Sequence, residues 1–153
     1  MPIVVGPLLD QSAVCMPILR LLPGWFGLET ALLQYEKDID GLPTFLAKDG
    51  GAVLGFLSLK QHNPYSAEVL VMGVRPEVQR GGLGRVLVQA TEAYARGLGV
   101  EYLQVKTLGP SNPDPGYAKT RLFYEAMGFR PLEEFKQIWD ANNPCLVMVK
   151  WIL

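Results

Sequence analysis

Residues 67–85 read AEVLVMGVRPEVQRGGLGR, and this stretch decides the fold. Its first eight residues are mostly apolar, which is typical of a strand that is buried on both faces. A glycine-rich loop follows, and from Leu83 onward the apolar positions repeat at helical spacing. Glycines let backbone N–H groups approach an anion closely, and a helix N-terminus adds unpaired N–H donors. We therefore expect a phosphorylated ligand to bind at Gln79, Arg80, Gly81, Gly82, Leu83, Gly84 and Arg85, where the two arginines add charge-assisted donors.

The spacing of this loop argues against two common nucleotide sites. It lacks the Lys-Ser/Thr ending of a Walker A loop, and its GGLG spacing differs from the GxGxxG of a dinucleotide fold. Nucleotide hydrolysis and hydride transfer are therefore disfavoured.

The flanking sequence alternates between helical and strand patterns. Apolar periodicity and turn signals predict helices over 11–22, 29–39, 83–97 and 117–127, and strands over 44–48, 52–60, 67–74, 101–107, 130–138 and 144–152. The strands over 44–48 and 52–60 should form a hairpin, and the last two an antiparallel pair. The order begins with two helices and predicts an α/β domain with a mixed sheet, and the 153 residues suit one domain over 1–153.

Composition excludes several classes of function. The net charge of -1 gives no general attraction to nucleic acid, and no apolar run approaches the roughly 20 residues that span a bilayer, so we expect a soluble cytoplasmic protein. Cys15 and Cys145 lie far apart and are expected to be buried thiols. With His62 as the single histidine, we expect no metal site.

Two motifs, separated by a predicted strand, point to one family. Val74-Arg75-Pro76 precedes Gln79-Arg80-Gly81-Gly82-Leu83-Gly84, and Leu122-Phe123-Tyr124-Glu125-Ala126-Met127-Gly128-Phe129 follows downstream. Together they resemble the signatures of the GNAT (Gcn5-related) N-acetyltransferases over residues 67–131. The resemblance implies the acyl-CoA N-acyltransferase fold, a central mixed sheet with helices on both faces. It also implies transfer of an acetyl group from acetyl-CoA to a primary amine, by direct attack in a ternary complex.

The resemblance assigns roles to particular residues. The loop backbone would bind the pyrophosphate, and the main chain at Met72 and Val74 would pair with the pantetheine arm. Tyr124 matches the tyrosine that protonates the leaving thiolate, although a tyrosine on a packed helix is also a common core residue. Glu68 lies eleven residues before Gln79, where histone acetyltransferases of this family place their general base. Weaker candidates for the base are Glu101, His62 and an ordered water.

The second motif departs from the family at two positions. Many members carry Asn and Ala seven and four residues before the tyrosine, where this chain has Tyr117 and Thr120. Lys119 or Asn112 could supply coenzyme A contacts there, and Phe123 together with Met72 would bear on the length of the acyl chain. The candidates for the acceptor pocket are Trp25, Phe26, His62 and Tyr117, and packing is an equal explanation for the first two.

Three other functions stay open. The chain could bind acyl-CoA as a sensor without turnover, could transfer a longer acyl chain, or could be an interaction domain with a structural loop. The low charge content is compatible with a homodimer. The sequence does not identify the amine.

Overall fold

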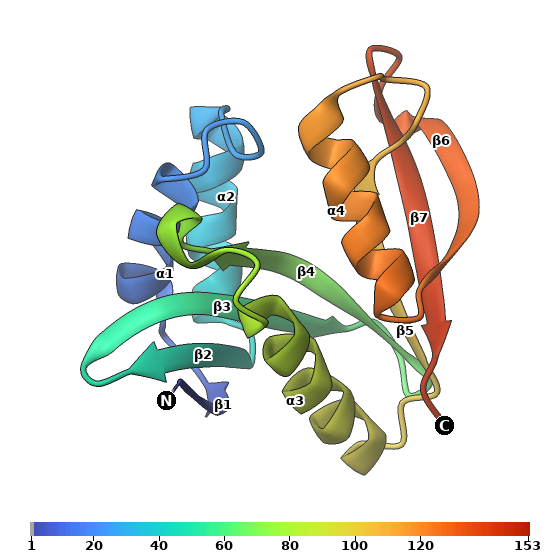
Figure 1. Cartoon of the computed structure of the whole chain (residues 1–153). Helices are drawn as coiled ribbons and strands as arrows, with labels where there is room; N and C mark the ends of the chain where they lie inside the picture. Colours follow the sequence, from blue (N-terminus) through green and yellow to red (C-terminus); the bar gives the residue numbers. More distant parts are fainter. Residues whose placement is uncertain (1) are drawn as a thin grey trace. The chain divides into compact units, whose positions relative to one another are not determined.

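The computed structural model describes residues 2–153, which form a mixed α/β fold (Figure 1). Within these residues seven strands make one sheet, in the order β1-β2-β3-β4-β5-β7-β6. The strands are β1 (Ile3–Leu8), β2 (Thr44–Asp49), β3 (Ala52–Gln61), β4 (Ser66–Val74), β5 (Tyr102–Leu108), β6 (Arg130–Asp140) and β7 (Asn143–Trp151). The helices are α1 (Ser12–Arg20), α2 (Glu29–Asp40), α3 (Leu83–Gly97) and α4 (Pro115–Ala126), and a 3₁₀ turn, η1, covers Pro76–Val78.

The sheet is mixed, as the sequence predicts. β4 and β5 run parallel, whereas the pairs β1–β2, β2–β3, β5–β7 and β6–β7 are antiparallel. The hairpin β2–β3 and the closing pair β6–β7 confirm two of the predicted connections. β4 lies between β3 and β5, which explains its apolar sequence.

The chain divides into two compact units, and β4 contributes to both. The first unit contains the residues up to Lys60 together with Leu70–Tyr94, and the second contains Gln61–Val69 and Ala95–Leu153. The single domain expected over 1–153 stays a prediction. No helix within residues 2–153 has both the length and the apolar character needed to cross a membrane.

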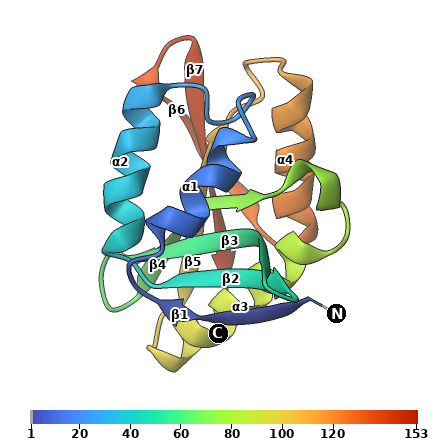
Figure 2. The same cartoon turned by 90° about the vertical axis from the view of Figure 1, so that its left-hand side faces the viewer.

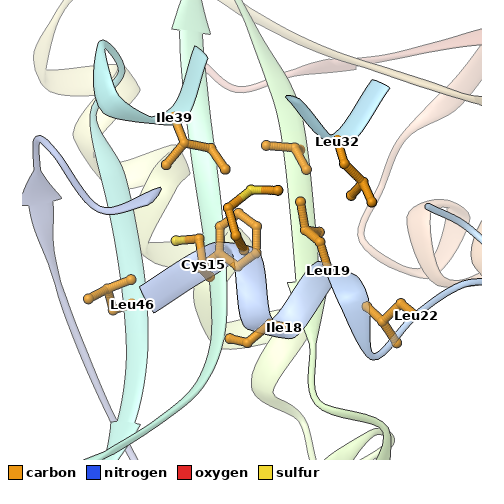
Figure 3. Close-up of a cluster of buried hydrophobic side chains, with 10 residues drawn as sticks. Cys15, Ile18, Leu19, Leu22, Leu32, Ile39 and Leu46 are labelled. Atoms are coloured by element: carbon orange, nitrogen blue, oxygen red, sulfur yellow. The ribbon is translucent and has the colours of Figure 1, made fainter. Parts of the chain in front are cut away.

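In the first unit, α1 and α2 cover one face of the strands. Their buried side chains meet those of the strands in a cluster formed by Cys15, Met16, Ile18, Leu19, Leu22, Leu32, Ile39, Leu46, Phe56 and Val71 (Figure 3). The other face packs on α3, because the Phe45 ring lies 5.6 Å from that of Tyr94 and contacts it edge-on. Helices therefore flank both faces of these strands, as the resemblance implies.

Strand β1 corrects the predicted element order, which begins with a helix. It pairs antiparallel with β2, and Figure 2 shows the two strands side by side. The sequence IVVGPL is short, is interrupted by Gly6-Pro7 and is largely exposed, so it shows no alternation of buried and exposed positions. Backbone pairing with β2 holds it in place, and that interaction leaves no local sequence signal.

Helix α4 starts two residues earlier than predicted, at Pro115 rather than at Tyr117. The Asp114 carboxylate accepts hydrogen bonds from the N–H groups of Gly116 at 2.8 Å and Tyr117 at 3.1 Å. Pro115 occupies the first turn, where a missing N–H costs nothing. Asp114 and Pro115 therefore form a helix start, and the loop ends at Asp114.

Candidate functional site

The glycine-rich loop lies in the first unit, between η1 and α3. Gly82 begins the helix, since its carbonyl accepts the first helical hydrogen bond from Val86 N–H at 3.2 Å. The N–H groups of Leu83, Gly84 and Arg85 therefore belong to the first turn and have no acceptor within the helix. Such a turn attracts anions through these donors and through the positive end of the helix dipole.

Backbone conformation shapes this loop. Gly82 has φ +86° and Arg80 has φ +68°, a left-handed conformation that costs a non-glycine residue free energy. The buried Leu83 side chain anchors the loop, whereas the side chains of Arg80 and Arg85 are exposed. Strain in an exposed, arginine-bearing loop is typical of a segment held in place for a ligand.

The exit of β4 into this loop is fixed by hydrogen bonds. Arg75 donates to the carbonyls of Val53 and Leu54, through its side-chain Nε and its backbone N–H, both at 2.9 Å. The Gln79 side-chain amide donates to the Val74 carbonyl at 3.1 Å. A cleft of about 390 Å³ beside the loop is lined by Pro2, Asp49, Leu54, Glu77, Val78, Gln79, Arg80, Gly81 and Leu83. The predicted phosphate loop is thus rigid at its entry and open on one side.

Met72 and Val74 are half-buried and alternate along β4 with Gly73. A Cβ atom at Gly73 would lie 3.3 Å from side-chain atoms of Ile18, Leu19 and Phe56. Close packing against α1 therefore explains this glycine. The main-chain contacts expected here with pantetheine stay a prediction.

In the second unit, two charged or titratable side chains converge on Glu68. Its carboxylate Oε1 lies 2.8 Å from His62 Nε2, and Lys106 Nζ lies 3.0 Å from both Oε1 and Oε2. The Glu68 side chain is only 4% exposed, against 31% for His62 and 29% for Lys106. The buried carboxylate is therefore paired, as a buried charge requires.

A tight turn between β3 and β4 positions His62. The N–H of His62 donates to the Ser66 carbonyl at 3.0 Å. Within the turn, the Asn63 side-chain oxygen accepts from Tyr65 N–H at 2.8 Å and Ser66 N–H at 3.0 Å. Asparagine commonly forms such turns through its own side chain. The imidazole is therefore carried by a fixed backbone.

Sequence reasoning named Glu68 and His62 as rival bases, and the structure brings them together. It missed Lys106, which reaches Glu68 because β4 and β5 are parallel with Glu68 opposite Gln104. One signal could have found it, since a carboxylate in a buried strand needs a cation and Lys106 is the cationic residue of the neighbouring predicted strand. Glu101, the other candidate carboxylate, lies just before β5 and binds Tyr65 and Ile152 through its backbone.

Cys145 on β7 lies in the same electrostatic surroundings. Burial raises the pKa of its thiol to about 11, Lys106 lowers it and Glu68 raises it. The thiol is therefore neutral at physiological pH and is no nucleophile there. Within residues 2–153 no group of His, Cys, Asp and Glu side chains is arranged to hold a metal ion.

Tyr124 is buried in α4, with its ring 5.3 Å from that of Phe123 and 5.6 Å from that of Phe129, both edge-on. Of the other residues expected on this helix to touch coenzyme A or substrate, Lys119 is exposed and Tyr117 is half-buried. The packing of Tyr124 is compatible with either the acid role or the core role.

The two aromatic residues proposed for the acceptor pocket behave differently. Phe26 packs on the α1–α2 cluster, and its ring lies 5.8 Å from that of Tyr35. Trp25 is 37% exposed. Packing therefore accounts for Phe26, and Trp25 is the more accessible candidate.

With this geometry established, comparison with known proteins identifies the family. Residues 16–129 match the model of the acetyltransferase (GNAT) family. The chain belongs to the GNAT family. This confirms the resemblance drawn from the two motifs.

Relatives and solved structures agree with this assignment. The chain is 30% identical over 123 residues to the mycothiol acetyltransferase of Beutenbergia cavernae, covering 80% of this chain and 36% of the relative. It is 38% identical over 64 residues to the N-alpha-acetyltransferase RimI of Mycobacterium tuberculosis, covering 40% of each. The matched region spans about a third of the length of the mycothiol acetyltransferases from Beutenbergia cavernae and Mycolicibacterium gilvum.

The fold is shared with solved structures of low sequence identity. Ard1 from Thermoplasma volcanium superposes with a TM-score of 0.79 at 14% identity, over 99% of this chain and 98% of that one. A GNAT acetyltransferase from Elizabethkingia anophelis with acetyl-CoA bound superposes with a TM-score of 0.72 at 16% identity, over 98% of this chain and 97% of that one.

Proposed function

We propose that this GNAT protein transfers an acetyl group from acetyl-CoA to a primary amine by direct attack in a ternary complex. One observation carries the proposal: the glycine-rich loop presents first-turn N–H groups of α3 beside two exposed arginines, Arg80 and Arg85. A pyrophosphate matches this arrangement, because each N–H and each guanidinium can donate to a phosphate oxygen. Acetyl-CoA bound to a GNAT neighbour and coenzyme A bound to an aminoglycoside 6'-N-acetyltransferase support the choice of ligand.

The remaining candidate residues would take roles in cofactor binding and in proton transfer. The backbone of residues 79–85 would hold the pyrophosphate, with pantetheine along Met72 and Val74 and further contacts from Lys119 and Phe123. Tyr124 would donate a proton to the leaving thiolate, and the cluster around Glu68 would accept the proton of the attacking amine. The amine would add to the acetyl carbonyl carbon, and the thioester C–S bond would then break.

The acceptor would be a primary amine of a small molecule or of a peptide. Trp25, Phe26, His62 and Tyr117 are the candidate acceptor contacts. We also propose that the protein acts in the cytoplasm, where acetyl-CoA is available. The homodimer expectation stays a proposal, which light scattering would test.

The test is calorimetric titration of acetyl-CoA into the wild-type chain, Gly82→Asp and Gly99→Asp. Gly82 and Gly99 have similar φ values, +86° and +83°, and a Cβ at either meets open space, so the two substitutions impose similar strain. Gly82 lies in the proposed phosphate site, whereas Gly99 follows the far end of α3. Binding that Gly82→Asp abolishes and Gly99→Asp retains supports the site.

Other outcomes distinguish the alternatives. Binding without thiol release on addition of any amine would favour an acyl-CoA sensor. Tighter binding of a longer acyl-CoA would favour a different acyl donor, with the acyl chain near Met72 and Phe123. Absence of binding to the folded wild-type chain would contradict the transferase and leave an interaction domain.

A further inference from the structure

In the cluster formed by Glu68, His62 and Lys106, the atom that can still accept a proton belongs to His62. The Glu68 carboxylate, paired with the ammonium of Lys106, can only accept hydrogen bonds, so at 2.8 Å His62 Nε2 must be the donor. A neutral imidazole that donates through Nε2 keeps its lone pair on Nδ1. Within residues 2–153 the structure places no hydrogen-bond partner on that nitrogen.

Glu68 is poorly placed to accept the proton itself. Both of its oxygens already accept from Lys106 at 3.0 Å, one also accepts from His62, and the side chain is almost fully buried. Protonating it would break the pair with Lys106 and leave an uncompensated ammonium. His62 has no such conflict, because its imidazole is about one-third exposed and its second nitrogen is open.

We propose that His62 Nδ1 is the general base of the acetyl transfer, with Glu68 as the positioning residue that orients the imidazole and Lys106 as the cation that fixes Glu68. The proposal rests on the transferase function proposed above. As the amine nitrogen bonds to the acetyl carbonyl carbon, its proton passes to Nδ1. The thioester C–S bond breaks, and the thiolate takes a proton from Tyr124. The imidazolium formed is stabilised by the Glu68 carboxylate.

Two titratable groups from other strands lie near Glu68. Lys106 on β5 contacts its carboxylate, and Cys145 on β7 feels the charges of both, with a thiol that stays neutral over the working pH range. A carboxylate at this position selects the tautomer whose Nε2 carries the proton, because a carboxylate can only accept a hydrogen bond. Replacing Glu68 with Gln should weaken this preference, because a side-chain amide can also donate.

The first experiment measures this coupling without turnover. His62 is the only histidine, so its ¹⁵N imidazole signals need no assignment. We expect the neutral imidazole of the wild type to carry its proton mainly on Nε2, and the share of this tautomer to fall in Glu68→Gln. A tautomer share that Glu68→Gln leaves unchanged would overturn the positioning role.

The second experiment measures rates with acetyl-CoA and two probes, glycinamide and an alanine-terminated peptide, by release of the coenzyme A thiol. For His62→Gln we expect kcat/KM at neutral pH to fall about 10²-fold or more, with loss of the enzyme's own acid limb from the pH profile. For Glu68→Gln we expect a smaller loss. The ionisation of the amine is common to all variants and cancels in the comparison.

The outcomes separate this proposal from the transferase function. Turnover with a wild-type profile in His62→Gln would overturn the base and leave the transferase intact. A large loss of kcat/KM in Glu68→Gln but not in His62→Gln would also overturn the role of His62 as the base. Acetyl-CoA binding without turnover of either probe would contradict both the general base and the transferase function. If Glu68→Gln fails to fold, His62→Gln still decides the matter, because that side chain lies on an exposed turn.

Discussion

Lys106 Nζ lies 3.0 Å from both carboxylate oxygens of Glu68, so a cation of β5 neutralises a buried anion of β4. Parallel pairing of the two strands makes this contact, since Glu68 lies opposite Gln104 and Lys106 follows two residues later on the same face. A paired carboxylate of this kind does not attract cations as a free one would. The contact therefore makes Glu68 a structural anchor as well as a candidate in the chemistry.

Replacing Lys106 alone should destabilise the fold more than replacing both Lys106 and Glu68. Lys106→Met leaves the Glu68 carboxylate buried with only His62 as a partner, and we expect the free energy of unfolding to fall by about 2–4 kcal/mol. The double variant Glu68→Gln/Lys106→Met should recover part of that loss, because no charge is then buried. Urea unfolding of the single and double variants measures the coupling, and strictly additive losses would contradict the pair.

In the glycine-rich loop, by contrast, a substitution should stabilise the fold. Arg80 has φ +68°, which is unfavourable for a residue that carries a side chain. Arg80→Gly should raise the free energy of unfolding by up to about 1 kcal/mol, since relief of strain exceeds the added freedom of the unfolded chain. The same change should weaken acetyl-CoA binding, because a charge-assisted donor is lost. Arg80→Ala is the matched control: it loses the donor but keeps the strain, so affinity should fall without a gain in stability. Denaturation and calorimetry measure the two effects separately.

Asp114 should contribute to stability through the start of α4. Its carboxylate accepts from two backbone N–H groups, so Asp114→Ala should cost about 1 kcal/mol of unfolding free energy. Asp114→Asn retains an accepting oxygen and should cost much less. Thermal unfolding of both variants distinguishes the cap from a general effect of the site, and equal losses would count against the cap.

Much of this structure was readable from sequence because its signals are local. The loop at residues 79–85 lies between an apolar strand and an amphipathic helix, and each of those features is visible within a few residues. Glu68 and His62 were each singled out, but as rivals, because their bond depends on the fold of the turn over 62–66. Lys106 was missed because its partner comes from another strand. β1 was missed because its stability comes from pairing with β2 rather than from its own pattern.

The two cysteines yield a prediction with a definite direction in pH. Burial raises the pKa of Cys15 to about 12, with a further contribution from Asp40, and burial raises that of Cys145 to about 11. Both thiols are buried, so the native chain should react slowly with Ellman's reagent near pH 8, and guanidinium should release both. Because the folded state favours the neutral thiols, their stabilisation is complete below the ordinary value of 9.0 and declines as pH rises from there through the raised values. Urea unfolding between pH 8 and pH 11 should show this decline, and Cys15→Ala should reduce its slope. A slope unchanged in Cys15→Ala, or rapid labelling of the native chain, would contradict the burial that sets these pKa values.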